Sequence, residues 1–335
     1  MKKIGILGSG TWGTALANLL TGIGHQVTLW SKFPHEKDAL EKNLTHPNLP
    51  GVKLNSKIYF STEIVESVRD QDIIVFATPS VFVRETALLA CPFLSGEQII
   101  VTVAKGIEEG TLLTTSEAIR DTLKEKNLPI VALSGPTHAE EVALELPSCI
   151  VAACEDLKYA EIIQNVFYSS KCLRVYTNQD ILGVEICGAL KNIIAIATGM
   201  SDGLGYGDNA KAALITRGLR EIICIGLAMG ANVETFSGLT GIGDIVVTAT
   251  SAQSRNYQAG YLLGQGYSLQ ETLAKVGMVV EGLNCLKAAI ALEKKYDLSL
   301  PIIDSVYRIV EGKMAVREAV SALFARKKQN EINFY

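Results

Sequence analysis

The stretch from Lys3 to Trp30 reads KIGILGSGTWGTALANLLTGIGHQVTLW and decides the fold of the chain's first half. An apolar run, Ile4–Leu7, leads into the glycine-rich segment Gly8–Gly13, and a helical pattern of apolar residues follows. Gly24 ends that pattern, and a second apolar, β-branched run covers Val27–Trp30. A G-x-G-x-x-G motif between a strand and a helix is typical of a turn that binds a dinucleotide. We therefore predict a β-α-β unit with that function; the plainer alternative is a glycine-rich packing turn.

Each glycine of the motif has a physical role in that prediction. Gly8 permits the tight turn, Gly10 lets the backbone approach a pyrophosphate, and Gly13 lets the helix pack on the strand. The helix that starts there offers free N–H groups and a partial positive charge to the phosphates.

The end of the second strand indicates which dinucleotide the turn prefers. Sites that prefer NAD usually carry a carboxylate there, for the ribose 2′-hydroxyl. Here the position holds Ser31 and Lys32, and the closest carboxylate, Glu36, is flanked by the potential cations His35 and Lys37. We therefore predict a preference for NADP(H), with use of NAD(H) possible. The alternative is that Lys32 is simply solvated.

Composition excludes several classes of protein. A chain of 335 residues suits two domains. Its net charge of −4 indicates neither a nucleic-acid-binding surface nor a basic membrane-binding patch. Seven scattered cysteines without a C-x-x-C motif indicate neither a metal nor a redox pair, so we expect buried thiols of a reducing cytoplasm. We expect no segment with the roughly 18 consecutive apolar residues of a membrane span.

Strand and helix patterns alternate in the first half of the chain, which favours a mostly parallel sheet covered on both faces. We expect the polar segment Asn43–Lys57 to be a surface excursion. After residue 180 strand signals vanish and long helical patterns follow. We therefore predict an α/β, doubly wound Rossmann domain over 1–180 and an all-helical domain over 181–335. The expected strands after the first two are Ile73–Ala77, Ile99–Val103, Ile130–Leu133, Ile150–Ala153 and Leu173–Tyr176.

Polar residues follow two of these strands, at the edge where ligands bind in such a sheet. Lys105 follows Ile99–Val103, and its ammonium can bind a phosphate or a substrate oxygen. Gly135 and Thr137 follow Ile130–Leu133, in a loop suited to wrap a nicotinamide or substrate. An exposed lysine and an ordinary loop are the plainer interpretations.

The helical half begins with an unusual lysine. Lys191 and Asn192 are the only strongly polar residues between Ile186 and Thr198, in an apolar helix. Burial and neighbouring cations lower the pKa of a lysine, which makes its amine a usable proton donor near neutral pH. The alternative is a side chain that reaches solvent.

A glycine-rich segment, GLTGIGD, ends at Asp244 and leads to Ser254-Arg255-Asn256. Asp244 can hold a lysine ammonium or a substrate hydroxyl, and Arg255 offers a fork of donors for a phosphate. We expect hydroxyls here, Thr248, Thr250 and Ser254 among them, to complete an anion pocket, and Gly282 to lie in a further loop. A capped helix connection is the alternative.

At this point the chain resembles the NAD(P)-dependent glycerol-3-phosphate dehydrogenases of the bacterial type. The match runs in order over nearly the whole chain and rests on ILGSGTWGTALA, VAKGIE, LSGPTHAEEV, EICGALKNIIAIATGMSDGLGYGDNAKAALITRGL, GLTGIGDIVVTATSAQSRN and VVEG. The resemblance implies reduction of dihydroxyacetone phosphate at C2 in a cleft between the two domains. It also implies a cytoplasmic homodimer that supplies the backbone of glycerophospholipids, with no metal.

The resemblance also implies roles for particular residues. Lys191 is the expected proton donor and acceptor, and Asp244 the residue that orients it. The expected substrate-binding residues are Lys105, Gly135, Thr137, Lys191, Asp244, Ser254, Arg255 and Asn256. The expected cofactor-binding residues are Gly8, Gly10, Thr11, Trp12, Gly13, Lys32, Lys105, Ala139, Arg255, Val279 and Glu281. Family members often carry Arg or His where Lys32 stands.

Two other functions are compatible with parts of this pattern. β-Hydroxyacid dehydrogenases share the domain types and a helix-borne lysine, but space their asparagine a helical turn after it; here position 195 is Ala. A regulator that senses NADP(H) without turnover would be favoured by a helix lacking Lys191, which is present.

Overall fold

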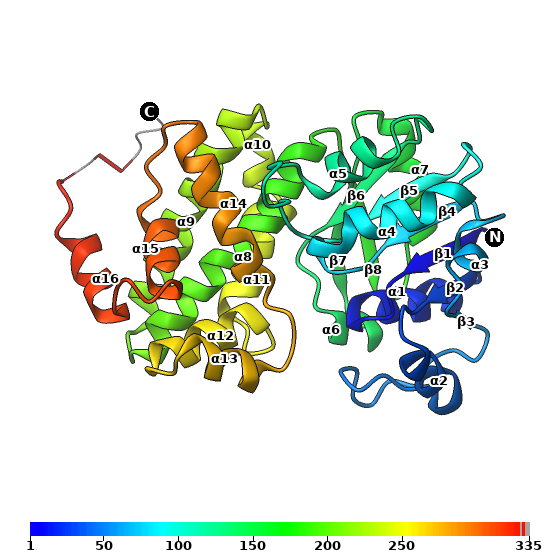
Figure 1. Cartoon of the computed structure of the whole chain (residues 1–335), viewed down its shortest axis with the longest axis horizontal. Coiled ribbons are helices and arrows are strands. Elements are labelled where there is room, and N and C mark those ends of the chain that lie inside the picture. The colour runs from blue at the N-terminus through cyan, green and yellow to red at the C-terminus, as the bar shows by residue number, and fades with distance from the viewer. Residues whose placement is uncertain (329, 332–335) are drawn as a thin grey trace. The chain divides into compact units, whose positions relative to one another are not determined.

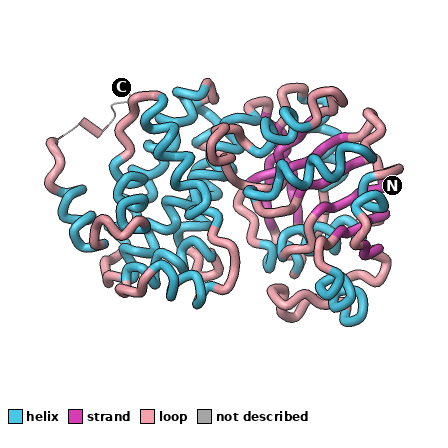
Figure 2. Tube along the Cα trace, in the orientation of Figure 1, coloured by secondary structure: helices cyan, strands magenta, loops and turns pink. Residues whose placement is uncertain are grey.

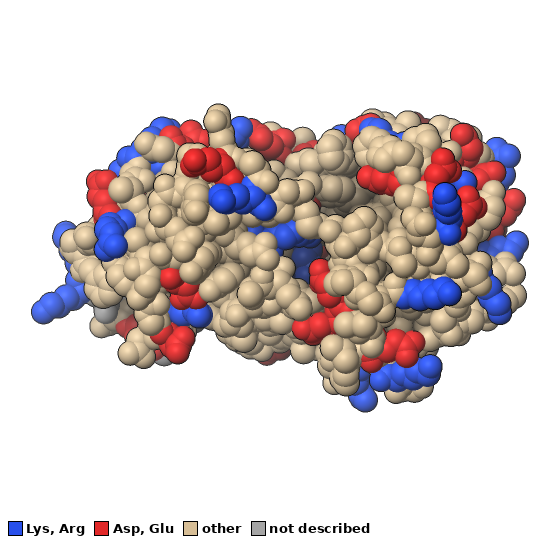
Figure 3. All heavy atoms as spheres, turned by 90° about the horizontal axis from the view of Figure 1, so that it is seen from below, with Lys and Arg blue, Asp and Glu red and all other residues tan. Residues whose placement is uncertain are grey.

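The computed structural model describes residues 1–328 and 330–331 of the 335-residue chain. These residues form two compact units (Figure 1). Unit 1 comprises residues 1–105 and 113–185, and unit 2 comprises residues 106–112 and the chain from 186 onward. Figure 2 shows that the described strands belong to unit 1, whereas unit 2 is helical. On the face shown in Figure 3, acidic and basic side chains are interspersed, without a broad patch of one charge.

Unit 1 is built on one eight-stranded sheet with the order β3-β2-β1-β4-β5-β6-β7-β8. Every neighbouring pair is parallel except β6 with β7, which confirms the predicted doubly wound, mostly parallel sheet. Strand β3, which has only three residues, was not predicted. The strands are β1 Lys3–Leu7, β2 Gln26–Trp30, β3 Tyr59–Ser61, β4 Ile73–Phe76, β5 Ile99–Thr102, β6 Ile130–Ser134, β7 Ser148–Ala153 and β8 Leu173–Asn178.

Both faces of the sheet are buried, because side chains on a strand alternate between faces. On β4, Ile73 and Val75 belong to one apolar core, and Ile74 and Phe76 to the other. Helices α1 Thr11–Gly22, α6 Ala139–Ala143 and α7 Leu157–Phe167 contribute to the first core. Helices α3 Ile64–Val68, α4 Val83–Ala90 and α5 Thr115–Thr122 contribute to the second.

The polar segment from 43 to 57 is not simply a surface excursion. It follows helix α2 (Pro34–Asn43), and three of its residues, Leu49, Val52 and Leu54, are buried in the first core. These apolar residues are spaced irregularly among polar ones, so neither helical nor strand periodicity reveals them.

A buried carboxylate fixes the start of α8 (Ile181–Gly203) within unit 1. Glu185 accepts hydrogen bonds from the hydroxyls of Thr114 and Thr115 at 2.8 and 2.7 Å, and from the Ser116 backbone N–H at 2.8 Å. The Ser116 hydroxyl donates to it as well. Burial raises the pKa of Glu185, while these hydrogen bonds oppose the rise. Glu185 thus caps the N-terminus of α5.

Helix α8 continues into unit 2 as its most apolar helix. Its length and mean hydropathy of 1.7 suffice for a membrane span by composition alone, although Glu185, Lys191 and Asn192 interrupt its apolar run. Its most apolar window is 94% buried in the protein, as in the core helix of a globular domain. The other helices of unit 2 are α9 Asp208–Met229, α10 Val233–Phe236, α11 Asp244–Thr250, α12 Arg255–Gly264, α13 Leu269–Val276, α14 Glu281–Lys295, α15 Pro301–Val310 and α16 Val316–Phe324.

Glycines let α8 and α12 pack with their backbones in close contact. A Cβ on Gly199 would lie 2.1 Å from the Tyr257 carbonyl oxygen, and one on Gly260 would lie 2.0 Å from that of Ile196. Gly203 of α8 and Gly264 of α12 repeat the contact one turn later. No side chain fits at these points, so the two helices are held at one separation and register.

Glu221 of α9 holds the N-terminus of α15. Its two carboxyl oxygens accept the backbone N–H groups of Ile302 and Ile303 at 2.8 and 3.0 Å. Burial raises the pKa of Glu221 to about 8, although these hydrogen bonds and the charge of Arg326 act in the opposite direction.

This pKa predicts a pH dependence of stability. Between the ordinary carboxyl pKa of 4.5 and about 8, Glu221 is protonated in the folded state and ionised in the unfolded state. Its contribution to the free energy of unfolding should therefore fall as pH rises through this window. Glu221→Gln should remove that fall and lower stability by about 1–3 kcal/mol, because its amide NH₂ cannot accept a helix N–H. Urea denaturation from pH 5 to 9 measures both effects. The exposed Glu234→Gln is the control, and an unchanged pH dependence in Glu221→Gln would contradict the assignment.

Candidate active site

The glycine-rich turn of unit 1 has the geometry that a phosphate-binding turn requires. Gly8 adopts φ +124°, and a Cβ there would lie 2.8 Å from the Ala77 backbone. A Cβ on Gly13 would lie 2.0 Å from the Gly8 carbonyl oxygen, so this glycine sets how closely α1 approaches the turn. Gly10 has no atom within 4 Å of its Cβ position, which leaves space for a ligand.

The N-terminus of α1 completes this turn. The helix ladder begins with Thr14 N–H donating to the Gly10 carbonyl at 2.9 Å, and no side chain caps the helix. The N–H groups of Thr11, Trp12 and Gly13 precede that ladder and carry the positive end of the helix dipole. These residues fit a dinucleotide pyrophosphate.

A carboxylate does stand at the end of β2, contrary to the sequence analysis. Glu36 of α2 lies with its Oε2 atom 3.2 Å from the hydroxyls of both Ser31 and Ser9. Lys32 instead donates to Glu85 of α4 at 2.8 Å, in an ion pair whose side chains are 52% and 51% exposed. The structure thus weakens the argument for an NADP(H) preference, which assumed a cation and no carboxylate here.

Several predicted residues meet at the carboxyl ends of β5 and β6. The Lys105 ammonium donates to the Gly135 carbonyl at 3.3 Å, and the Thr137 N–H donates to the same oxygen at 2.9 Å. Ala139 begins α6 directly after this loop. These residues lie at the same edge of the sheet as the glycine turn, because Gly8 also follows the carboxyl end of its strand.

Unit 2 contains a buried lysine whose ammonium contacts one carboxylate and one hydroxyl. The Lys191 ammonium donates to Asp244 Oδ1 at 2.7 Å, and the two side chains are only 7% and 1% exposed. The ammonium also donates to the Thr248 hydroxyl, which in turn donates to the Asp244 carbonyl at 2.6 Å. The π-helical turn Leu239–Gly243 presents Asp244 at the first position of α11. This arrangement can hold a charged amine away from bulk water.

A second polar network links three helices next to Lys191. The Asn256 side chain donates to Asn192 Oδ1 at 3.0 Å and accepts the Gly282 N–H at 2.9 Å. Gly282 lies in the first turn of α14 rather than in the predicted loop. A Cβ there would lie 2.7 Å from the Asn192 carbonyl oxygen, so the glycine allows close contact between α14 and α8. A glycine is thus needed at this position for contact between two helices, not for a turn.

The hydroxyls of the predicted anion pocket differ in their partners within unit 2. Thr248 is committed to Lys191 and Asp244, and the exposed Thr250 donates to the Val246 carbonyl of its own helix. Ser254 caps α12, accepting the Tyr257 N–H at 3.3 Å. The hydroxyl hydrogens of Thr248 and Thr250 are therefore used within unit 2, whereas that of Ser254 has no acceptor among the described residues.

The Arg255 guanidinium differs from its neighbours in unit 2. It lies at the first position of α12 and is exposed, and it has no hydrogen bond or ion pair within residues 1–328 and 330–331. It is therefore free to bind an anion. Of the other predicted cofactor residues in unit 2, Val279 is exposed and Glu281, half-buried, begins α14.

No metal site is found in the part of the chain that the structure describes, since no three His, Cys, Asp or Glu side chains gather there. All seven cysteines are free thiols. Burial raises the pKa of the Cys285 thiol to about 12, which makes it an inert core residue.

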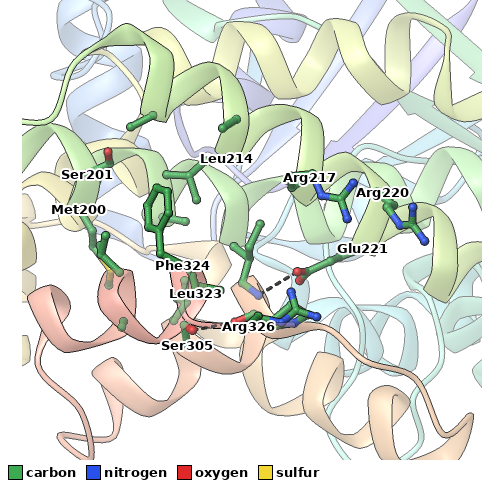
Figure 4. Close-up of a pocket in the computed structure, with 18 of the residues that line it drawn as sticks. Met200, Ser201, Leu214, Arg217, Arg220, Glu221, Ser305, Leu323, Phe324 and Arg326 are labelled. Atoms are coloured by element: carbon green, nitrogen blue, oxygen red, sulfur yellow. Dashed lines mark hydrogen bonds between the residues drawn. The ribbon is translucent and has the colours of Figure 1, made fainter. Parts of the chain in front are cut away.

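The cavity in Figure 4 is separate from these predicted residues. It has a volume of about 1730 Å³ within unit 2, and apolar side chains such as Leu214, Leu323 and Phe324 line it. Arg217 and Glu221 add charge to its wall, and none of the predicted site residues takes part.

Comparisons with known proteins agree with the resemblance seen in the sequence. Family models described as the N-terminus and C-terminus of NAD-dependent glycerol-3-phosphate dehydrogenase match residues 3–160 and 180–321. The chain is 54% identical to glycerol-3-phosphate dehydrogenase [NAD(P)+] 2 of Lactobacillus delbrueckii subsp. bulgaricus, over 99% of each chain. It is 49% identical to the Bacillus subtilis glycerol-3-phosphate dehydrogenase [NAD(P)+], over 99% of this chain and 96% of that one. The crystal structure of a Coxiella burnetii glycerol-3-phosphate dehydrogenase superimposes with a TM-score of 0.92 at 35% identity, covering 97% of this chain and 99% of that one.

The glycine contact within the turn gives a direct test of this site. Gly13→Ala should displace α1 from the turn and weaken NADH and NADPH binding by about fivefold or more, because overpacking costs about 1–3 kcal/mol. Gly22→Ala, in the same helix with no atom within 4 Å of its Cβ position, is the matched control and should bind normally. Isothermal titration calorimetry with each nucleotide measures the difference. Equal binding by the two variants would contradict the geometry described.

Proposed function

The chain belongs to the NAD-dependent glycerol-3-phosphate dehydrogenase family, and from this premise we propose which residues carry out the reaction. The enzyme is an oxidoreductase that interconverts dihydroxyacetone phosphate and sn-glycerol 3-phosphate with NAD(P)H or NAD(P)+. Membership of this family rules out the two alternatives, a β-hydroxyacid dehydrogenase and a regulator without turnover. The assignment of individual residues rests on the geometry of each unit.

Reduction of the C2 ketone needs a hydride at carbon and a proton at oxygen. A bound reduced nicotinamide supplies the hydride. We assign the proton to the Lys191 ammonium, which the 2.7 Å contact with Asp244 keeps charged and oriented in the interior of unit 2. In the oxidative direction the Lys191 amine accepts the same proton. The buried Lys191–Asp244 pair is the observation that carries this proposal.

Asp244 and Thr248 serve as positioning residues for the lysine. An ammonium has three N–H donors, and two of them are directed by Asp244 Oδ1 and the Thr248 hydroxyl. A flexible four-carbon side chain is thereby held in one conformation, so the donor is placed before the substrate binds.

We assign the substrate phosphate chiefly to Arg255, whose planar fork of donors is exposed at the N-terminus of α12. The neighbouring Asn256 is already fixed by Asn192 and Gly282, which makes it a rigid polar contact for the same ligand. Ser254 supports this site by capping the helix. In unit 1 we assign Lys105, Gly135 and Thr137 to further substrate oxygens, as the resemblance implies.

We assign the nucleotide to unit 1 through the Gly8–Gly13 turn and Ala139 at the start of α6. The resemblance also implies that Lys32, Lys105, Arg255, Val279 and Glu281 contact the nucleotide. The ion pair between Lys32 and Glu85 argues against that role for Lys32. The product, glycerol 3-phosphate, is the backbone of phospholipids. We therefore propose that the enzyme supplies this compound for phospholipid synthesis. The seven free thiols support a reducing cytoplasm as its location.

We further propose a homodimer, as the resemblance implies. Phe324 is 86% exposed and Leu227 is 39% exposed beside the cavity of Figure 4, and association would cover such apolar surface. Light scattering of the full chain, which gives the mass in solution, tests this proposal against a monomer of 36.1 kDa.

The role of Lys191 predicts the effect of removing its amine. Lys191→Ala should lower turnover by about 10²–10⁴, the usual scale of a general acid, while nucleotide binding persists. Lys287→Ala, which removes an exposed lysine paired with Glu109, should keep wild-type turnover. The readouts are the rate of NADH and NADPH oxidation with dihydroxyacetone phosphate and the binding of each nucleotide. Near wild-type turnover in Lys191→Ala would refute the role.

The role of Arg255 predicts a different pattern. Arg255→Lys keeps the charge but loses the planar fork. The lost binding free energy should be about 1.5–3 kcal/mol, and the KM for dihydroxyacetone phosphate should rise accordingly. Unphosphorylated dihydroxyacetone should be a very poor substrate of the wild-type enzyme, because binding energy at the phosphate drives the reacting end. Steady-state kinetics with both substrates check this. An unchanged KM for dihydroxyacetone phosphate would place the phosphate elsewhere.

A further inference from the structure

Glu36 places a carboxylate beside the glycine-rich turn, where sites of this fold contact the adenosine ribose. We propose that Glu36 selects NAD(H) over NADP(H), by accepting a hydrogen bond from the ribose 2′-hydroxyl and by repelling a 2′-phosphate. The inference deepens the proposed function and rests on the nucleotide site assigned there to unit 1.

Two hydroxyls hold the Glu36 side chain at this place. The Ser9 and Ser31 oxygens lie 2.8 Å apart, and each is 3.2 Å from Glu36 Oε2. Each hydroxyl has a single hydrogen, so the chain Ser9 to Ser31 to Glu36 uses both. Ser9 is the residue between the first two glycines of the turn, and Ser31 directly follows β2. The carboxylate is therefore joined to both elements that frame the ribose.

The second oxygen of Glu36 remains for a ligand. Among the described residues, no hydrogen bond or ion pair reaches Oε1, and the residue as a whole is exposed. A ribose 2′-hydroxyl is a donor, and this oxygen is an acceptor that needs no rearrangement of the protein to receive it.

The two nearby lysines are directed to other carboxylates. Lys32 is 2.8 Å from Glu85, and Lys37 is 2.6 Å from Glu41. Within the described part of the chain neither lysine pairs with Glu36. His46 is near enough to feel the charge of Glu36, but burial lowers its pKa, so its imidazole is neutral at physiological pH. A 2′-phosphate would thus approach a carboxylate without a committed counter-ion.

Selectivity of this kind needs both an attraction and a repulsion. The 2′-phosphate is a phosphomonoester and carries about −1.5 to −2 charges near neutral pH. Like charges brought together at a binding site are strongly disfavoured. The Lys32–Glu85 pair is exposed and therefore weak, but a released Lys32 would still share the site with Glu36.

The test measures dissociation constants rather than activity alone. Isothermal titration calorimetry with NADH and with NADPH is performed on the full-length wild type, Glu36→Gln, Lys32→Ala and Asp38→Asn. Asp38→Asn is the matched control, because it removes one exposed negative charge from the same helix. Melting temperatures of all four proteins verify that they are folded.

The wild type should bind NADH at least about tenfold more tightly than NADPH. Glu36→Gln should tighten NADPH binding about tenfold, while NADH binding weakens by no more than about threefold because the amide oxygen still accepts. Lys32→Ala and Asp38→Asn should each change the ratio of the two constants by less than about twofold. The gain in NADPH binding caused by Glu36→Gln should be smaller at high salt, because Glu36 is exposed.

Other outcomes would overturn the inference in distinguishable ways. A wild type that prefers NADPH, or a ratio that Glu36→Gln leaves unmoved while Lys32→Ala weakens NADPH tenfold, would assign selection to the lysine and leave the proposed reaction intact. Failure of the wild type to bind either nucleotide would overturn this inference and the proposed function together.

Discussion

The Lys191 and Asp244 side chains, only 7% and 1% exposed, lie 2.7 Å apart inside unit 2 as a buried ion pair. Removing either partner would leave an uncompensated charge in the interior, at a cost of about 3–5 kcal/mol. Replacing a buried ion pair by apolar side chains of similar volume often leaves stability unchanged or raises it. The pair is therefore weak evidence for a role in stability, and it is better explained as a proton donor kept in place.

The surroundings of this pair are built to keep its geometry fixed. Gly199 and Gly260 bring α8 and α12 into backbone contact, and Gly282 brings α14 onto the Asn192 carbonyl. The N-terminus of α12 is therefore held beside the turn of α8 that carries Lys191 and Asn192. Packed backbone has no rotamers, so these contacts position Asn256 more firmly than side-chain packing would. Preorganisation of the donors before substrate binding follows from this packing.

Much of the fold could be predicted from local sequence. The glycine motif, the short apolar strands and the helix with a lone lysine each leave a signal within a few residues, and the sheet and the helical half are confirmed. The three-residue strand β3 and the buried Leu49 leave no such signal. The role of Glu36 was also missed, since its partner Ser9 lies 27 residues away in sequence. Glu185 and Gly282 were misjudged or overlooked for the same reason: their partners are distant in sequence and near only after folding.

The measurement that most directly tests the central claim is a double-mutant cycle on the buried pair. Lys191→Met, Asp244→Asn and the double variant remove the charges with little change of volume. Single-turnover reduction of dihydroxyacetone phosphate, measured beside melting temperatures, gives the loss caused by each. If the pair acts as one unit, each single variant should lose most of the rate, and the double variant should be within about threefold of the slower single variant. Losses that multiply, or a fast Lys191→Met variant, would contradict the account.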